Sequence, residues 1–242
     1  MTKIPSVADL KQGAVILIDK PYKWTSFDAI NAVKTLLKLK IGHCGTLDPL
    51  ATGLLICCTG EMTKQISQYQ QLPKEYTGIF QLGADTESYD LESVPKNFKP
   101  IEDITVGQIM AAVETLTGEI MQIPPAHSAV KLEGKRSYEL ARSGVEVTLT
   151  ARPVIIGTFE ILKIELPEVH FRIECSTGTY IRALARDLGD ALGCGAYLKE
   201  LRRTKIGNFK VADALTPLQY KDHWVENNEL PRKDSKRGQP GV

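Results

Sequence analysis

The chain has 242 residues, 43% of them hydrophobic and 24% charged, and its formal net charge at pH 7 is +1. This length allows one large domain or two small ones, and the composition excludes a disordered or fibrous protein. The N-terminus has no apolar signal-peptide core, and the longest aliphatic run, residues 14–18, is too short to cross a bilayer. We therefore expect a cytoplasmic protein without a membrane contact.

The first half of the chain mixes short strand and helix patterns. Residues 14–19 (AVILID) predict a buried strand, and a helix with one apolar face follows from Ser26, which we expect as its N-cap. Further strands are expected at 52–58 and 75–83, with a short helix from Glu61 between them. Residues 84–104 read as an acidic loop, and 105–118 as an amphipathic helix that ends at Gly118.

The second half begins with a less regular stretch, residues 119–153. Two strands at 153–165 and 168–177 precede a helix that runs from Thr179 to Leu192. After Leu218 the sequence is polar and predicts a loose tail over 219–242. Because strands and helices do not alternate cleanly, we expect a mixed α/β or α+β fold.

The five cysteines do not form a recognisable framework. Their number is odd and no C-x-x-C occurs, which fits neither paired disulfides nor a zinc site. We expect reduced, mostly buried thiols and no metal.

The loop GHCGTLDPLATGLL, residues 42–55, surrounds a single carboxylate, Asp48. Its glycines allow something to approach the backbone closely, and Pro49 biases Asp48 away from the helical region. Asp48 fits the N-cap of a helix, and it also fits a catalytic nucleophile or base; the two readings are compatible. No glycine-rich nucleotide cradle occurs in the chain, so no organic cofactor is expected.

Arg182 has no carboxylate three or four residues away in its own predicted helix, whereas Arg186 has Asp190. Since a cation near a helix start is not favoured by the dipole, Arg182 requires a carboxylate from elsewhere or extends into water. A basic segment, residues 199–210, reads either as a solvated face or as an RNA-backbone footprint.

Together these segments resemble the TruB family of pseudouridine synthases. The resemblance rests on LIDKPYKWTS (17–26), the Asp48 loop, GEMTKQISQY (60–69), KEYTGIFQLGADTESYD (74–90), IPPAHSAVKLEGKRSYELARSG (123–144) and CSTGTYIRALARDLGDALGCGAYLKELRR (175–203). It covers residues 15–218, nearly the whole predicted fold. Several motifs in the same order make it specific, although each alone is weak.

The resemblance implies a fold, an activity and a set of site residues. The fold is a mixed, mainly antiparallel sheet flanked by helices, and the activity is isomerisation of uridine 55 in the T-arm of tRNA, without metal or organic cofactor. Asp48 is implied to be the essential aspartate and Arg182 its partner. Tyr76 is implied to stack on the target uracil and Tyr180 to line the same pocket. His43 is implied to sit in the space that the flipped nucleotide vacates, and Lys20 and Lys64 to hold phosphates. Further candidates for RNA-backbone contacts are Lys131, Lys135, Arg136, Arg202 and Arg203.

The expected organisation is one catalytic domain over 1–218, with an RNA-binding insertion at about 119–153 and no PUA-like module in the 219–242 tail. We expect a monomer without a protein partner. The sequence departs from the family pattern at Lys23, where glycine is common, and at His127, where tyrosine is common. Two other functions stay open: a non-catalytic RNA-binding module and a uridine methyltransferase.

Tyr76 carries a second expectation. Alternation along its strand turns Glu75 and Thr77 to the opposite face, so Tyr76 can face the cleft. The residue is then a core tyrosine with a bonded hydroxyl, a stacking platform for the base, or a phenol that helps to remove the proton from carbon 5.

Overall fold

The computed structural model describes residues 4–126, 131–132, 135–136, 149–227 and 229. The helices are α1 (Val7–Gln12), α2 (Ser26–Leu37), η1 (Gly60–Gln65), α3 (Ile66–Gln70), α4 (Val106–Thr115), α6 (Ile181–Ala191), η2 (Val211–Asp213) and α7 (Pro217–Glu226). The strands are β1 (Val15–Lys20), β2 (Ile41–His43), β3 (Thr52–Thr59), β4 (Lys74–Leu82), β5 (Gly118–Gln122), β6 (Lys131–Leu132), β7 (Lys135–Arg136), β8 (Arg152–Glu165), β9 (Glu168–Cys175), β10 (Ala196–Ile206) and β11 (Phe209–Lys210).

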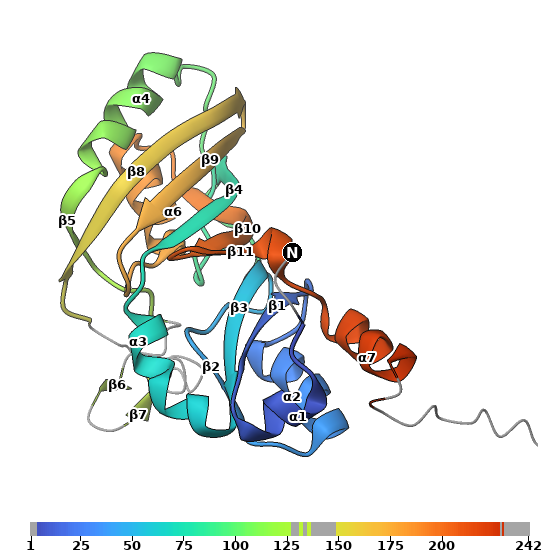
Figure 1. Ribbon diagram of the computed structural model, residues 1–242. Helices are drawn as coiled ribbons and strands as arrows, with labels where there is room; N and C mark the ends of the chain where they lie inside the picture. The colour runs from blue at the N-terminus through green and yellow to red at the C-terminus, as the bar shows by residue number, and fades with distance from the viewer. Residues whose placement is uncertain (1–3, 127–130, 133–134, 137–148, 228, 230–242) are drawn as a thin grey trace, which may run out of the picture.

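One large sheet organises the described residues, with the strand order β1-β3-β10-β4-β9-β8-β5 and with β2 and β11 added to β3 and β10 (Figure 1). All neighbouring pairs are antiparallel except β3 and β10. Strands β6 and β7 form a separate two-stranded ladder. The prediction of a mixed, mainly antiparallel sheet flanked by helices is therefore confirmed.

Most helices share one continuous core with the sheet. Alternate residues of β1 and β3, such as Ile16, Ile18 and Leu55, pack with apolar residues of α1, α2, α4, α6 and α7. The intervening residues, such as Leu17 and Leu54, face a smaller core covered by η1 and α3. Because neighbouring strand residues point to opposite faces, this arrangement separates the two faces of the sheet.

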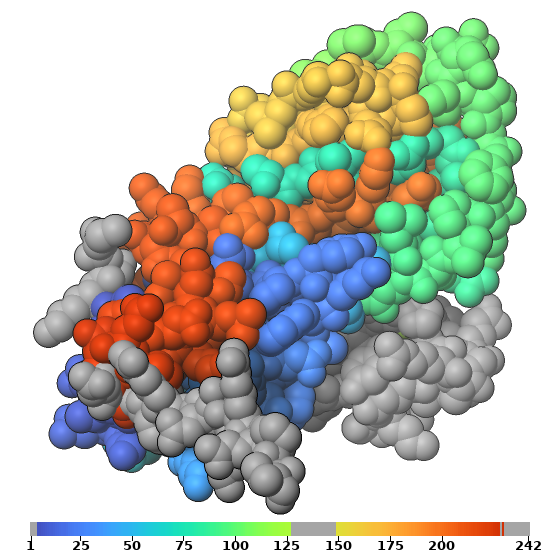
Figure 2. Space-filling model, turned by 90° about the vertical axis from the view of Figure 1, so that its right-hand side faces the viewer, coloured from blue at the N-terminus to red at the C-terminus, as the bar shows by residue number. Residues whose placement is uncertain are grey.

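The two ends of the described chain lie side by side. In Figure 2 the blue N-terminal segment adjoins the orange and red C-terminal third. Trp224 of α7 is fully buried and donates from Nε1 to the carbonyl oxygen of Pro5, and Leu215 donates its backbone N–H to Leu17. The predicted tail boundary at 219 is therefore wrong, because Tyr220 and Trp224 give residues 217–226 an apolar face that packs on the core.

Other sequence predictions differ in detail. Thr25 rather than Ser26 caps α2, in a capping box with Asp28. Gly118 follows the end of α4 as expected, with φ of 90°, but it opens the unpredicted strand β5. The predicted basic segment, residues 199–210, overlaps strand β10, which lies in the middle of the sheet.

Lys23 has φ of 64°, so the turn keeps the left-handed conformation that a glycine adopts without strain. His127 and much of the predicted insertion lie outside the described residues. In the described parts of the chain, no helix combines the length and apolar character that crossing a bilayer requires.

Candidate active site

One row of residues crosses the sheet beneath the 42–55 loop. The strand registers pair Lys20 with Gly53, Gly53 with Arg203, Arg203 with Tyr76, and Tyr76 with Ile173. Residues in one row project from the same face of a sheet. Four motifs distant in sequence, those with Lys20, Gly53, Tyr76 and Arg203, therefore meet here.

Gly53 makes this meeting possible. Its φ is 104°, and a Cβ atom there would lie 2.3 Å from the carbonyl oxygen of Arg203. At Gly42, a Cβ atom would lie 2.6 Å from Cδ1 of Ile66. Both glycines thus allow close approach by neighbouring parts of the protein, and the loop needs them for its own packing.

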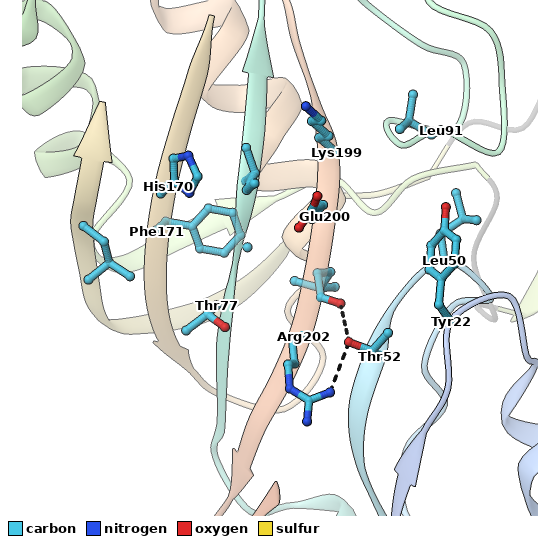
Figure 3. Close-up of a pocket in the computed structure, with 14 residues that line it drawn as sticks. Tyr22, Leu50, Thr52, Thr77, Leu91, His170, Phe171, Lys199, Glu200 and Arg202 are labelled. Atoms are coloured by element: carbon cyan, nitrogen blue, oxygen red, sulfur yellow. Dashed lines mark hydrogen bonds between the residues drawn. The ribbon is translucent and has the colours of Figure 1, made fainter. Parts of the chain in front are cut away.

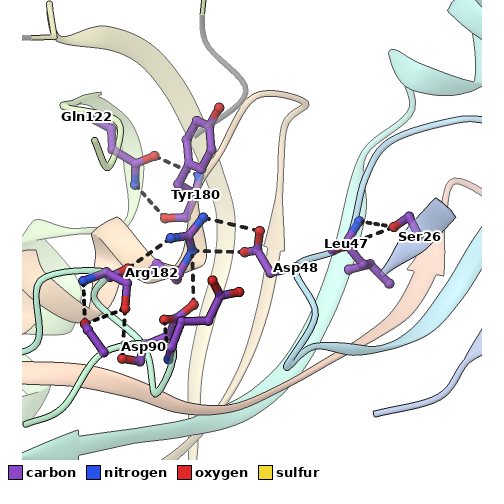
Figure 4. A network of polar contacts seen from close by, with 10 residues as sticks. Ser26, Leu47, Asp48, Asp90, Gln122, Tyr180 and Arg182 are labelled. Carbon is purple, nitrogen blue, oxygen red and sulfur yellow. Dashed lines mark hydrogen bonds and ion pairs between the residues drawn. The ribbon is translucent and has the colours of Figure 1, made fainter. Parts of the chain in front are cut away.

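The loop is fixed at several points. The backbone N–H of Cys44 donates to Ile56 at 2.8 Å. The Ser26 hydroxyl accepts from the N–H of Leu47 at 2.8 Å and donates to its carbonyl oxygen at 3.0 Å (Figure 4). Ser26 is 2% exposed, so these bonds are shielded from water. The residue before Asp48 is therefore held from both sides.

Asp48 and Arg182 form the predicted contact. Nε of Arg182 lies 2.9 Å from Oδ2 of Asp48, and its Nη2 lies 3.3 Å from Oδ1. The guanidinium is buried, with 6% of its side chain exposed, whereas the Asp48 side chain is 38% exposed. The Nη2 contact is a hydrogen bond and the Nε contact is an ion pair, and together they hold the carboxylate at two points. The result is a carboxylate that is held on one side and open on the other.

The alternative reading of Asp48 as a helix N-cap is wrong. Its carbonyl oxygen accepts from the N–H of Ala51 at 3.1 Å, and the turn leads directly into β3. Pro49 keeps Asp48 out of the helical region, and the following residues enter the sheet.

A second carboxylate at Arg182 was missed by the sequence analysis. Oδ2 of Asp90 lies 3.6 Å from Nε of Arg182, and the Asp90 side chain is 4% exposed. The carbonyl oxygen of Ser88 accepts from Nη1 of Arg182 at 2.9 Å. Asp90 and Ser88 lie in the predicted acidic loop, residues 84–104. Only the tertiary contact of this loop with α6 shows that they bind Arg182.

Gln122 was also missed. Its side-chain oxygen accepts from the N–H of Tyr180 at 2.8 Å, and its side-chain nitrogen donates to the Tyr180 carbonyl at 3.1 Å (Figure 4). Gln122 is 2% exposed and ends strand β5, while Tyr180 precedes the first residue of α6. This pair of bonds sets where α6 begins and hence where Arg182 points.

Tyr76 lies on the same face of the sheet as the fixed loop and is 9% exposed. Glu75 and Thr77 point to the other face, as predicted: Glu75 contacts Lys205 there, and Thr77 lines a cavity. Burial is the main cause that raises the pKa of the Tyr76 phenol, Arg203 opposes it, and Asp48 adds to it. A raised pKa keeps the phenol protonated at neutral pH, which argues against a phenolate base.

Lys20 is not placed to hold a phosphate. It is fully buried, and its ammonium group donates to the carbonyl oxygens of Pro21, Trp24 and Pro49. Burial lowers its pKa from 10.5 to about 8, against an opposing effect of the Asp48 charge. The prediction of a phosphate contact at Lys20 is wrong, because the protein uses this cation to hold the residue that follows Asp48.

The two arginines of β10 are likewise engaged within the protein. Arg202 forms a two-point contact with Asp19, at 3.0 and 2.7 Å. Arg203 is 2% exposed and donates to the carbonyl oxygens of Leu54 and Gly45. Arg203 cannot reach RNA, so that candidate is wrong; Arg202 is committed to Asp19.

The remaining candidates are less constrained. His43 is partly buried, and its Nε2 lies 3.0 Å from the Thr46 hydroxyl. Burial, aided by the Arg203 charge, lowers the pKa of His43. Lys64 is mostly exposed and pairs with Glu61. The backbones of Lys131, Lys135 and Arg136 lie in the β6–β7 ladder, and their side chains fall outside what the structure describes.

A cavity of about 720 Å³ borders the 42–55 loop, because Leu50 and Thr52 of that loop line it (Figure 3). Thr77 and Arg202 line it, and each neighbours a residue of the row, Tyr76 and Arg203, that points to the other face. Asp48 and Arg182 do not line it.

All five cysteines are buried and free, as predicted. Among the residues that the structure describes, no group of three His, Cys, Asp or Glu is arranged to hold a metal ion.

Comparison with known proteins finds two matching family models. Residues 33–181 match the TruB family pseudouridylate synthase N-terminal domain, and residues 182–234 match the tRNA pseudouridylate synthase B C-terminal domain. The chain is 45% identical to tRNA pseudouridine synthase B of Phocaeicola vulgatus, over 92% of this chain and 97% of that protein. It is 51% identical to the Flavobacterium johnsoniae protein of the same name, over 84% and 93%.

A solved structure is also similar to this chain. A chain in the crystal structure of a Cbf5-Nop10-Gar1 complex is 31% identical, with a TM-score of 0.71. The match covers 93% of this chain and 59% of that one.

Proposed function

The chain belongs to the TruB family of pseudouridylate synthases, and we propose that it converts uridine 55 in the T-arm of tRNA to pseudouridine, with Asp48 as the essential carboxylate. The observation that carries the proposal is the contact of a half-open Asp48 with a buried Arg182. The name of its relatives, tRNA pseudouridine synthase B, supports tRNA as the substrate.

The reaction explains why a single open carboxylate suffices. The bond between ribose and the uracil nitrogen breaks, the base rotates, and carbon 5 bonds to the ribose. Carbon 5 loses its proton, and the freed nitrogen takes one up. Substrate and product are isomers, so neither a second substrate nor an energy source is consumed. A carboxylate can attack the base, attack the ribose, or remove a ribose proton, and the Asp48 geometry is compatible with each.

The substrate uridine must leave its stack before Asp48 can reach it, which costs a few kcal/mol. We assign Tyr76 as the platform on which the base stacks, a contact that contributes about 1–3 kcal/mol. Tyr180 lines the same pocket, and His43 occupies the space that the flipped nucleotide vacates. Because the pKa of Tyr76 is raised, its hydroxyl acts as a neutral hydrogen-bond donor in this proposal.

RNA-backbone contacts come from cations that the protein does not use internally. Lys64 meets this condition, since its side chain is 75% exposed and its partner Glu61 is equally open. Lys131, Lys135 and Arg136 of the insertion remain candidates on the basis of the family resemblance.

The test is release of tritium from carbon 5 of uridine in a T-arm stem-loop, with no cofactor added. Wild type is expected to release it, and Asp48→Asn to release none while it still binds the RNA. Asp103→Asn, which changes an exposed carboxylate in the 83–105 loop, is the matched control and should behave as wild type. Full turnover in Asp48→Asn would sink the proposal in favour of an RNA-binding module, and dependence on a methyl donor would favour a methyltransferase.

A further inference from the structure

Arg203 is a buried cation with an unusual set of partners. It is 2% exposed, its Nε donates to the Leu54 carbonyl at 2.7 Å, and its Nη2 donates to the Gly45 carbonyl at 3.1 Å. Within the described ranges of the chain, no carboxylate oxygen lies within 4 Å of its guanidinium nitrogens. The charge is therefore held by backbone carbonyls, with the phenol of Tyr76 as a further polar neighbour, in the interior of the protein.

Such an arrangement is expensive for stability. An ion taken out of water loses hydration, and carbonyl dipoles replace only part of it. An apolar side chain of similar length would fill the same space without this cost. The presence of a buried arginine at this position therefore requires a functional explanation.

The two carbonyls that Arg203 binds belong to different parts of the site. Leu54 lies in β3 at the end of the 42–55 loop, and Gly45 lies near its start, three residues before Asp48. Gly45 has φ of 101°, and a Cβ atom there would lie 3.8 Å from Nη1 of Arg203. The guanidinium thus spans the two ends of the loop and joins them through one rigid plane.

The Arg203 charge also acts on the residues around the pocket. It lowers the pKa of His43 and that of Lys74, in each case as the second cause after burial. It opposes the effect of burial on the pKa of Tyr76, its neighbour in the cross-sheet row. The Arg203 charge therefore acts on titratable groups on the side of the sheet where the base would stack.

We propose that Arg203 is a positioning residue for the isomerisation: its planar fork clamps the loop between Gly45 and Leu54, so that Asp48 stays in register with Arg182. This inference rests on the proposed function. Lysine cannot replace arginine here, because a single ammonium group lacks the fixed geometry that reaches two carbonyls in different directions.

The experiment compares Arg203→Met and Arg203→Lys with wild type in the T-arm tritium-release assay. Displacing a reacting group by about 1 Å costs on the order of 100-fold in rate, so we expect Arg203→Met to lower kcat by roughly that factor. Arg203→Lys, which keeps the charge and is the safer variant for folding, should lose about tenfold. The KM and the RNA dissociation constant should change by no more than about threefold in either variant, because Arg203 does not touch RNA.

Arg172→Met is the control. Arg172 is a partly exposed arginine on β9 that pairs with Glu160 and Glu75, and its variant should keep wild-type kinetics. A folded Arg203→Lys with wild-type kcat overturns the proposal. Equal losses of kcat and RNA affinity also overturn it, because they would indicate an RNA contact.

Hydrogen exchange of the 42–55 peptide provides a readout that does not depend on activity. Faster exchange in both Arg203 variants than in Arg172→Met supports the clamp, and unchanged exchange overturns it. If wild type releases no tritium, the proposed function fails, and this exchange result alone then decides the role of Arg203.

Discussion

Replacing Arg182 by methionine removes the cation that two carboxylates share. The guanidinium lies 2.9 Å from Oδ2 of Asp48 and 3.6 Å from Oδ2 of Asp90, and it donates to the Ser88 carbonyl. Methionine keeps much of the apolar stem, so the change tests mainly the charge and its hydrogen bonds.

The two carboxylates contribute unequally to the expected loss of stability. The Asp48 side chain is 38% exposed, so water can solvate it once Arg182 is gone, and its share is at most about 1 kcal/mol. The Asp90 side chain is 4% exposed, and a buried charge left without its partner costs about 3–5 kcal/mol. Asp90 still accepts from the Glu92 backbone N–H, so we expect a total near the lower end, about 3 kcal/mol.

The assay is urea unfolding followed by tryptophan fluorescence. Adding Asp90→Asn to Arg182→Met should recover at least about 1 kcal/mol, because the uncompensated buried charge disappears. The control Arg172→Met should lose about 1 kcal/mol or less, since Glu75 keeps its bonds from Lys205 and Thr204. The reasoning is refuted if Arg182→Met loses no more than Arg172→Met, or if Asp90→Asn recovers nothing.

Four further predictions concern single residues. Tyr76→Phe should give a single-turnover pH profile parallel to that of wild type between about pH 7 and pH 9, because burial raises the pKa of the phenol; a wild-type rate that climbs with pH and is flat in the variant would show a phenolate base. Lys23→Gly should raise the free energy of unfolding by about 0.5–1 kcal/mol, since φ is 64° there; a lower value in urea unfolding contradicts the strain. Burial lowers the pKa of Lys20 from 10.5 to about 8, so between these values the unfolded chain holds more protons and the stability contributed by this residue rises with pH. The unfolding free energy of wild type minus that of Lys20→Met should therefore increase from about pH 8 to pH 10. A constant difference would contradict the lowered pKa of Lys20. Lys64→Met should reduce the slope of log affinity against log salt by about 0.7–0.9, whereas an unchanged slope removes Lys64 from the RNA interface.

The sequence predicted those elements whose apolar pattern is sufficient on its own. Strands β1, β3, β4, β8 and β9 and helices α2, α4 and α6 lie close to their expected positions. Strand β10 was missed because AYLKELRRTKI does not show the apolar run of a central strand. Its charges are tolerated there because Asp19, Glu75 and backbone carbonyls satisfy them, and those partners are distant in sequence.

The same limit applies to the site. The absence of a carboxylate near Arg182 in its helix indicated a distant partner, and the family resemblance identified Asp48. Asp90 and Gln122 gave no comparable signal, because each acts through one tertiary contact with α6 or the residue before it. A pattern in the chain can show that a residue lacks a local partner, but it cannot show which loop will supply one.

The basic residues of the motifs divide into two groups once burial is known. Lys20, Arg182 and Arg203 are each at most 5% exposed and hold the catalytic loop or its carboxylate, whereas Lys64 extends into solvent. A buried cation releases no counterions when RNA binds, because it carries none. Substitutions in the first group should therefore change turnover and leave the salt slope alone, and substitutions in the second should do the reverse. Sequence position cannot separate the groups, since Lys20 and Lys64 both lie in motifs of the family, and only their surroundings decide whether each positive charge organises the protein or meets its substrate.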